Sequence, residues 1–327
     1  MMNFSLGMAF SLMVRTLPFI VFRMIVYFGI TTAIILLTGT GAGFGYGIGA
    51  FGTDEFQGSS TIWGGIIGFG GTVGAIFFFR DYLLYLVKAG HIAVMVELLQ
   101  GGQVPGGRGQ LDYAWGVVRD RFGEASALFA LDRLVHGVIG AITGIIEGIL
   151  SFFPIPGLQN IMGLLRAYLR VAVGLIDEMI IAHAIRTRAE NPWKNAQEAL
   201  VLYAQNAKPL MISAAWLTAI SWVLSFVVFL LMLAPAAGVI YLMPGDVAAG
   251  GFIFAFVFAW AVKAALIEPF CIACLMQTFF KVTEGQQPNP EWQAKLASVS
   301  DKFRHMGEQA SSWMGSRFTG IKPKPQA

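Results

Sequence analysis

The chain has 327 residues, of which 56% are hydrophobic and only 13% are charged. Soluble globular domains carry about a quarter charged residues, so this composition excludes an ordinary soluble domain and predicts a membrane protein with apolar surface facing lipid. The net charge is +3, and the Lys and Arg residues gather in a few segments. That distribution is typical of membrane topology and excludes nucleic acid as a partner.

The first elements are a short apolar helix and a membrane crossing. Residues 4–17 are apolar but interrupted by Arg15 and followed by Pro18, which predicts a helix lying at the membrane interface. Residues 19–38 then supply the roughly 20 apolar residues that a crossing needs. No cleavage site precedes the following glycines, so we interpret this segment as a retained first span.

A ladder of alternate glycines runs from Gly39 to Gly49 and is followed by Asp54 and Glu55. In a helix, such a ladder lets neighbouring helices approach closely. In an irregular segment, the glycines supply positive φ angles, but protein must then cover the unpaired amides. We favour a bent, protein-covered segment near the outer surface.

A second span is expected at residues 61–79. Small residues at helical spacing predict close helix packing both here and in the later run 134–153. The candidate packing positions are Gly64, Gly68, Gly70, Gly74, Gly140 and Gly144. After Arg80 and Asp81, residues 82–99 remain apolar but carry charge along one stripe, which favours an interfacial or protein-covered helix over a crossing.

Residues 112–133 are amphipathic and rich in Arg, so we place them in the cytoplasm. Two apolar arms, 134–153 and 161–185, then flank a tip with two prolines and a glycine, Pro154 to Gly157. The arms form either a full double crossing or a re-entrant hairpin, and both alternatives preserve the topology. Glu147 is a single acid well inside the first arm.

The second arm repeatedly interrupts its apolar run with charge. Ionisable residues at membrane depth cost several kcal/mol unless they are paired or lined by water, so they are functional candidates. The alternative is a helix that leaves the membrane with a solvated polar face. The candidates are Arg166, Arg170, Asp177, Glu178 and His183.

Asn191 and Pro192 are typical of a helix start, since Asn caps and Pro fits the first turn. We expect one long helix from there through the span 210–234, an outer loop at 235–249, and a last span at 250–280. Counted from a cytoplasmic N-terminus, both charge-poor loops lie outside and the C-terminus lies in the cytoplasm.

The last span contains Lys263, Glu268 and Pro269. Proline removes a backbone hydrogen bond, so we expect an irregular turn just before it, beside an acidic side chain. Such an arrangement is common at ion and cationic-solute sites. The alternative is a pair between Glu268 and an Arg or His of another helix that only holds the bundle together.

We expect two domains in this chain. Residues 1–284 form a transmembrane domain, and residues 285–327 form a tail with a cytoplasmic amphipathic helix and a disordered end. Its apolar residues are spaced alternately by four and three, as in a heptad seam. We expect the seam to lie on the inner leaflet, and the alternative is pairing with a copy or partner. The seam residues are Trp292, Leu296, Val299, Phe303, Met306, Ala310 and Trp313.

Parts of the C-terminal half resemble the choline-transporter-like family. The similar segments are 177–185, with Trp193, Ala196, Ala199 and Asn206 after it, and 262–274 around Glu268. The resemblance covers residues 160–285 at most and implies a related bundle core with choline-like cargo. Pro269 departs from the family pattern, and the chain lacks room for the family's roughly ten spans. Trp260 is a candidate wall for a cation, with an interfacial belt as the alternative.

These observations predict an all-α polytopic membrane bundle with about four full spans plus the hairpin, or six spans if the hairpin crosses. We find no nucleophile and base arrangement and no metal cluster, since Cys271 and Cys274 lack further ligands, so we expect neither an enzyme nor a cofactor. The expected function is transport or permeation of a small cationic or amphiphilic solute across the inner (plasma) membrane. The alternative is an oligomeric scaffold or accessory subunit, with membrane lipids and further copies or a membrane protein as partners.

Overall fold

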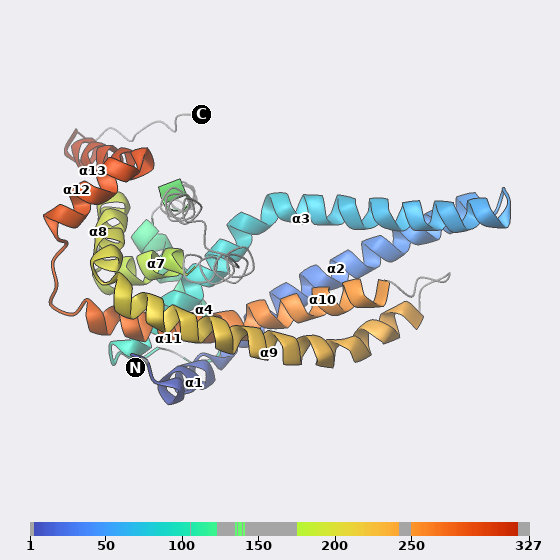
Figure 1. Ribbon diagram of the computed structural model, residues 1–327, viewed down its shortest axis with the longest axis horizontal. Coiled ribbons are helices and arrows are strands. Elements are labelled where there is room, and N and C mark those ends of the chain that lie inside the picture. Colours follow the sequence, from blue (N-terminus) through green and yellow to red (C-terminus); the bar gives the residue numbers. More distant parts are fainter. Residues whose placement is uncertain are drawn as a thin grey trace, which may run out of the picture. The chain divides into compact units, whose positions relative to one another are not determined.

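The computed structural model describes residues 3–104, 106–122, 135, 137, 138, 140, 175–241 and 250–319, without the side chains of 75–83, 108, 120–122, 250, 251 and 314–319. These residues are helical and include no strand, which confirms the all-α class for this part of the chain (Figure 1). The helices are α1 Leu6–Arg15, α2 Leu17–Gly49, α3 Asp54–Leu99, α4 Arg108–Phe122, α7 Ile176–Arg186, α8 Pro192–Gln205, α9 Ala207–Tyr241, α10 Gly250–Val262, the π-helical turn η1 Lys263–Ile267, α11 Glu268–Val282, α12 Pro290–Val299 and α13 Asp301–Thr319.

Three helical segments among the described residues are long and apolar enough to cross a membrane. They are Leu17–Gly49, Ala207–Tyr241 and Phe252–Val282, at 33, 35 and 31 residues. The protein is therefore a helical membrane protein. The predicted span 61–79 lies inside α3, and the predicted hairpin 134–185 lies largely outside the described residues, so the number of crossings stays a prediction.

The helices form two compact units. The tail unit comprises Met1–Thr16, Lys88–Ala219 and Cys271–Ala327, and the hairpin unit comprises Leu17–Val87 and Ile220–Phe270. Residues 285–327 belong to the same compact unit as α7 and α8, and the expected division at residue 284 into a membrane domain and a cytoplasmic tail stays a prediction.

In the hairpin unit, the glycine ladder is helical, and the expected bent segment is wrong. Helix α2 continues to Gly49, and α3 begins at Asp54 and runs alongside α2 (Figure 1). A Cβ built on Gly41 would overlap the carbonyl of Gly64, and one on Gly68 would overlap that of Leu37. A continuous helix bonds its own amides, and the glycines are used instead for contact between the two backbones.

Two helix boundaries, those of α3 and α9, also differ from the expected ones. Helix α3 passes through Arg80 and Asp81 without a break, although its last part is protein-covered as predicted, with Ile92 to Val96 fully buried. Helix α9 continues through Pro235 to Tyr241. There, Phe229, Leu233 and Val239 pack near Phe254 of α10, and these contacts offset the hydrogen bond that the proline removes.

The expected single helix after Asn191 is two helices that meet at Asn206. Pro209 has no N–H for the carbonyl of Gln205, so the chain starts a new helix that holds this proline in its first turn. The Asn206 side chain donates to the carbonyl of Leu202 at 2.9 Å and to Gln286 Oε1 at 2.8 Å. The predicted start is confirmed, since Asn191 Oδ1 accepts from the backbone of Trp193 and Lys194.

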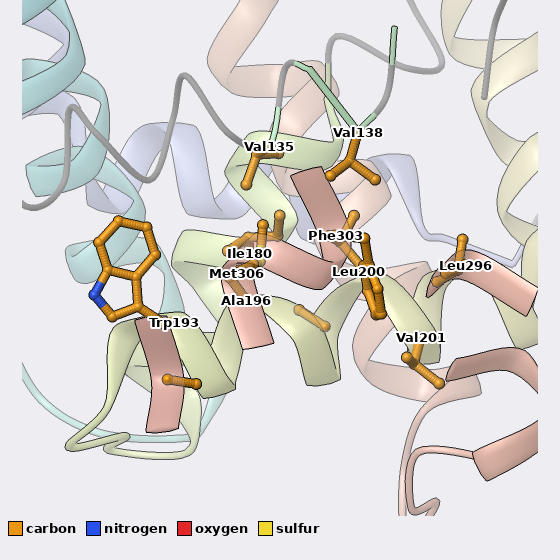
Figure 2. Packing of buried hydrophobic residues seen from close by; sticks show 12 residues of the cluster. Val135, Val138, Ile180, Trp193, Ala196, Leu200, Val201, Leu296, Phe303 and Met306 are labelled. Atoms are coloured by element: carbon orange, nitrogen blue, oxygen red, sulfur yellow. The ribbon is translucent and has the colours of Figure 1, made fainter. Parts of the chain in front are cut away.

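Four seam residues of the tail, Leu296, Phe303, Met306 and Ala310, are buried against the same chain. Helices α12 and α13 are separated at Ser300, whose backbone is extended, and both pack against α8 of the same chain. Figure 2 shows Leu296, Phe303 and Met306 in one buried cluster with Leu200 of α8. The break at Ser300 leaves Val299 43% exposed.

Hydrogen bonds fix the tail on the same helix. The Asn191 amide donates to the carbonyl of Ala310 at 2.8 Å, and the Gln197 amide donates to the carbonyl of Phe303 at 3.0 Å. The amphipathic pattern was read correctly, but its expected partner was wrong, because burial against α8 removes the same apolar side chains from water.

The contact between α2 and α3 predicts opposite effects for two glycines of α3. Gly64→Ala places a Cβ against the carbonyl of Gly41 and should lower the free energy of unfolding by about 1 to 3 kcal/mol. Gly70→Ala meets no described atom within 4 Å and should be neutral or slightly stabilising. Thermal denaturation of the purified protein in mild detergent measures both, and equal losses would contradict this packing.

The docked tail predicts a similar contrast within the seam. Phe303→Ala removes a fully buried ring and should lower the free energy of unfolding of the tail unit by about 3 kcal/mol. Val299→Ala changes an exposed position and should cost less than about 1 kcal/mol. The rate of protease cleavage around Gly285 measures release of the tail. Phe303→Ala should be cleaved faster than Val299→Ala, and equal cleavage rates would contradict the docked tail.

Candidate functional site

The most unusual polar arrangement in the described hairpin unit joins α2 to the π-helical turn η1. Arg23 of α2 is fully buried, and its Nη2 donates to the carbonyl oxygen of Ala264 at 2.5 Å. The same nitrogen lies 3.4 Å from Oε2 of Glu268, whose side chain is 32% exposed. A guanidinium and a carboxylate are thus paired inside segments that are able to cross a membrane. We call Arg23, Ala264 and Glu268 the ion-pair site.

Proline chemistry explains why the carbonyl of Ala264 is available. In η1 the N–H of Glu268 bonds to the carbonyl of Lys263, five residues back. The next donor in this register would be the N–H of residue 269, which would meet the carbonyl of Ala264. Residue 269 is proline and has no N–H, so this carbonyl lacks its helical donor and accepts from Arg23 instead. The predicted irregular turn before Pro269 is confirmed.

Small and aromatic residues complete the surroundings of the guanidinium. Ala261, Ala264 and Ala265 are buried beside Tyr27. The guanidinium carbon of Arg23 lies 5.6 Å from the centre of the Tyr27 ring, within the range of a cation–π interaction. The Tyr27 ring in turn meets Trp260 edge to face at 5.3 Å.

The hydrogen bonds of Arg23 are incomplete within the described part of the chain. Both of these bonds use Nη2, whereas Nε and Nη1 are buried and have no hydrogen-bond partner among the described residues. A buried donor left without an acceptor loses its hydration and costs about 1 to 3 kcal/mol, and more when the group is charged. The ion-pair site therefore holds a cation with unused donors.

The tail unit contains a second buried acid. Glu178 of α7 is 2% exposed, and its Oε1 accepts from Lys88 of α3 at 2.8 Å. Near the same end of α3, His91 Nε2 lies 3.0 Å from Oγ1 of Thr16. Full burial of an acid is tolerated when a base is held beside it.

His183 lies on α7, outside the three candidate spans. Its ring meets Phe279 edge to face at 6.0 Å, and its Nδ1 has no hydrogen-bond partner among the described residues. Burial, and secondarily the positive charge of Arg186, lower the pKa of His183 from 6.5 to about 4. The ring is therefore neutral at physiological pH.

The predicted site residues fall into three groups. Glu268, Trp260 and Lys263 lie in the hairpin unit, where Glu268 and Trp260 both neighbour the Arg23 and Tyr27 contact, while Lys263 is exposed on η1. Asp177, Glu178 and His183 lie together on α7 in the tail unit. Glu147, Arg166 and Arg170 lie outside the described residues, as does Gly144.

Among the predicted packing glycines, Gly64 and Gly68 contact the backbone of α2. A Cβ on Gly70, Gly74 or Gly140 would meet no described atom within 4 Å. The close contact with α2 therefore involves the pair Gly64 and Gly68 and not the pair Gly70 and Gly74.

The sequence-based reasoning missed Arg23 and Lys88 as partners of the two acids. Both are bases inside long apolar runs, which is the same signal that selected Glu268 and Glu178. Neither Arg23 nor Lys88 is among the predicted site residues. Comparing each acid of an apolar run with every base of another apolar run brings up both pairs.

The neutral state of His183 predicts a pH dependence. The unfolded chain binds a proton near pH 6.5 and the folded chain only near pH 4, so folding stability should fall as the pH drops through this window, by about 3 kcal/mol in total. His183→Leu should remove this component. Denaturation at neutral pH and near pH 4 compares the variant with the wild type, and an identical pH profile for both would contradict the assignment.

Comparison of the chain with protein-family models, with curated proteins and with solved structures finds no match. The resemblance of residues 160–285 to the choline-transporter-like family therefore rests on the sequence segments alone.

Proposed function

We propose that the protein is a non-enzymatic, multi-pass protein of the inner (plasma) membrane that transports or admits a small polar solute with a cationic or amphiphilic character. The observation that carries this proposal is the ion-pair site, where Arg23 and Glu268 meet beside a π-helical turn in apolar segments. Charged groups in such segments are costly, and in membrane proteins they mark solute and ion pathways.

The backbone at the site supports the same proposal. π-helical turns occur frequently at functional sites, and transporters place their binding sites where spanning helices are interrupted. The Glu268 side chain is 32% exposed, whereas that of Arg23 is fully buried. The site thus offers a partly exposed acid next to a buried base.

The scaffold alternative has weaker support. It relied on glycine faces and on the heptad seam as surfaces for assembly. Gly41, Gly64 and Gly68 are occupied by contact between α2 and α3, and Phe303 and Met306 of the seam are buried against the same chain. These three glycines and two seam residues are therefore already used within one copy.

Uptake into proteoliposomes tests the proposed function. Choline and its carboxylate analogue glycine betaine serve as the cationic and zwitterionic probes. Wild-type protein should take up at least one of them, and Glu268→Gln should reduce that uptake at least tenfold, because it removes the partly exposed charge and leaves Arg23 unpaired. Glu291→Gln, at an exposed position of α12, is the matched control and should behave as wild type.

Size-exclusion profiles of the variants in detergent separate loss of uptake from loss of folding. The proposal fails if wild-type vesicles take up neither probe faster than protein-free vesicles. It also fails if a well-folded Glu268→Gln protein takes up both probes at the wild-type rate.

A further inference from the structure

We propose that α1 lies in the plane of the membrane surface, with its exposed apolar stripe inserted among the acyl chains of one phospholipid leaflet. The stripe consists of Leu6, Phe10 and Val14, and we call it the lipid stripe. The sequence pattern predicts an interfacial helix here, and the structure identifies the face that meets lipid. The inference assigns phospholipid as the partner of a surface that the proposed function does not use, so it holds whether or not the protein transports a solute.

Hydrogen bonds within the tail unit hold α1 at both of its ends. At the N-terminal end, the backbone N–H of Ser5 donates to Oε1 of Gln277 on α11 at 3.0 Å. At the C-terminal end, the side-chain amide of Gln110 on α4 donates to the carbonyl of Arg15 at 2.8 Å. These two bonds oppose rotation of the helix about its axis, so each of its faces has defined surroundings.

The side chains of α1 fall on three sides of the helix. One side is buried and consists of Ala9, Leu12 and Met13. The lipid stripe recurs every fourth residue and forms a second side, with exposed fractions of 44%, 65% and 56% along the chain. Ser11 and Arg15 are exposed on a third side, each about 100° around the axis from the stripe residue before it, and the exposed Met8 borders this side. The exposed half of α1 thus has an apolar part and an adjoining polar part.

The chain places both ends of α1 next to segments that are able to cross a membrane. Helix α1 ends at Arg15, and the candidate span Leu17–Gly49 begins two residues later, at most about 7 Å along the backbone. Ser5 is bonded to Gln277, which lies five residues before the end of the candidate span Phe252–Val282. Helix α1 is therefore held at the level where these spans meet the membrane surface.

A phospholipid leaflet fits both exposed parts of α1 at once. An interfacial helix places its apolar face about 5 to 10 Å into the boundary between headgroups and acyl chains and keeps its polar face toward the headgroups. In this position the lipid stripe leaves water, and the guanidinium of Arg15 stays at the level of the lipid phosphates. The molecules that surround a membrane protein at this level are phospholipids, so they are the partner that we assign to the stripe.

Fluorescence quenching in phospholipid nanodiscs tests this assignment on the full-length protein. Phe10→Cys and Ser11→Cys are each labelled with bimane and reconstituted with phosphatidylcholine that carries a nitroxide either high on an acyl chain or on the headgroup. The two positions are adjacent along α1 and differ in face, so Ser11→Cys is the matched control. Cys271 and Cys274 are buried, and the unsubstituted protein treated with the same reagent gives the background.

The acyl-chain nitroxide should quench the label at position 10 about twofold more strongly than the label at position 11, because only the former faces the acyl chains. The headgroup nitroxide should quench the label at position 11 at least as strongly as the label at position 10. Val14→Cys lies on the same stripe and should reproduce the result for Phe10→Cys, which keeps the test decisive if one variant does not fold.

Two outcomes overturn the inference. Equal quenching of the labels at positions 10 and 11 by the acyl-chain nitroxide contradicts the assigned face. If neither nitroxide quenches the labels at positions 10 and 14, phospholipid does not cover the stripe, and a second copy or another protein does.

Discussion

The hydrogen bond from Arg23 to the carbonyl of Ala264 is the constraint on which the hairpin unit depends. Proline at position 269 removes the donor that this carbonyl would have in the π-helical register, and the guanidinium replaces it. The same guanidinium neutralises Glu268. One side chain of α2 thus compensates for both the backbone defect and the partly exposed carboxylate of the last span, so the two helices have a specific polar reason to lie together.

The tail is held on α8 mainly by the burial of apolar side chains, whereas α2 is held on the last span by a charged group. The seam of α12 and α13 has one face that must leave water, and the carbonyls of Phe303 and Ala310 bond to the side chains of Gln197 and Asn191. Lipid offers no such directed donors at these positions. Packing on α8 therefore satisfies backbone groups as well as apolar side chains, which an inner-leaflet position would leave to water.

What the sequence predicted was mainly local. The apolar runs, the cap at Asn191 and the disturbance before Pro269 depend on residues within one or two turns of each other, and all three were predicted correctly. Arg23 and Glu268 are 245 positions apart, and no periodicity connects them. The glycine ladder fits either a helix or a loop by itself, and only the approach of α3 decides between them.

Pairing changes the chemistry of the acids that first suggested a cation pathway. Glu268 lies beside Arg23, and Glu178 accepts from Lys88, so neither acid is a bare negative site for a cation. A cation that approaches Glu268 meets the field of the guanidinium, and that repulsion grows as the local dielectric falls. A solute that engages this carboxylate therefore competes with the guanidinium for it.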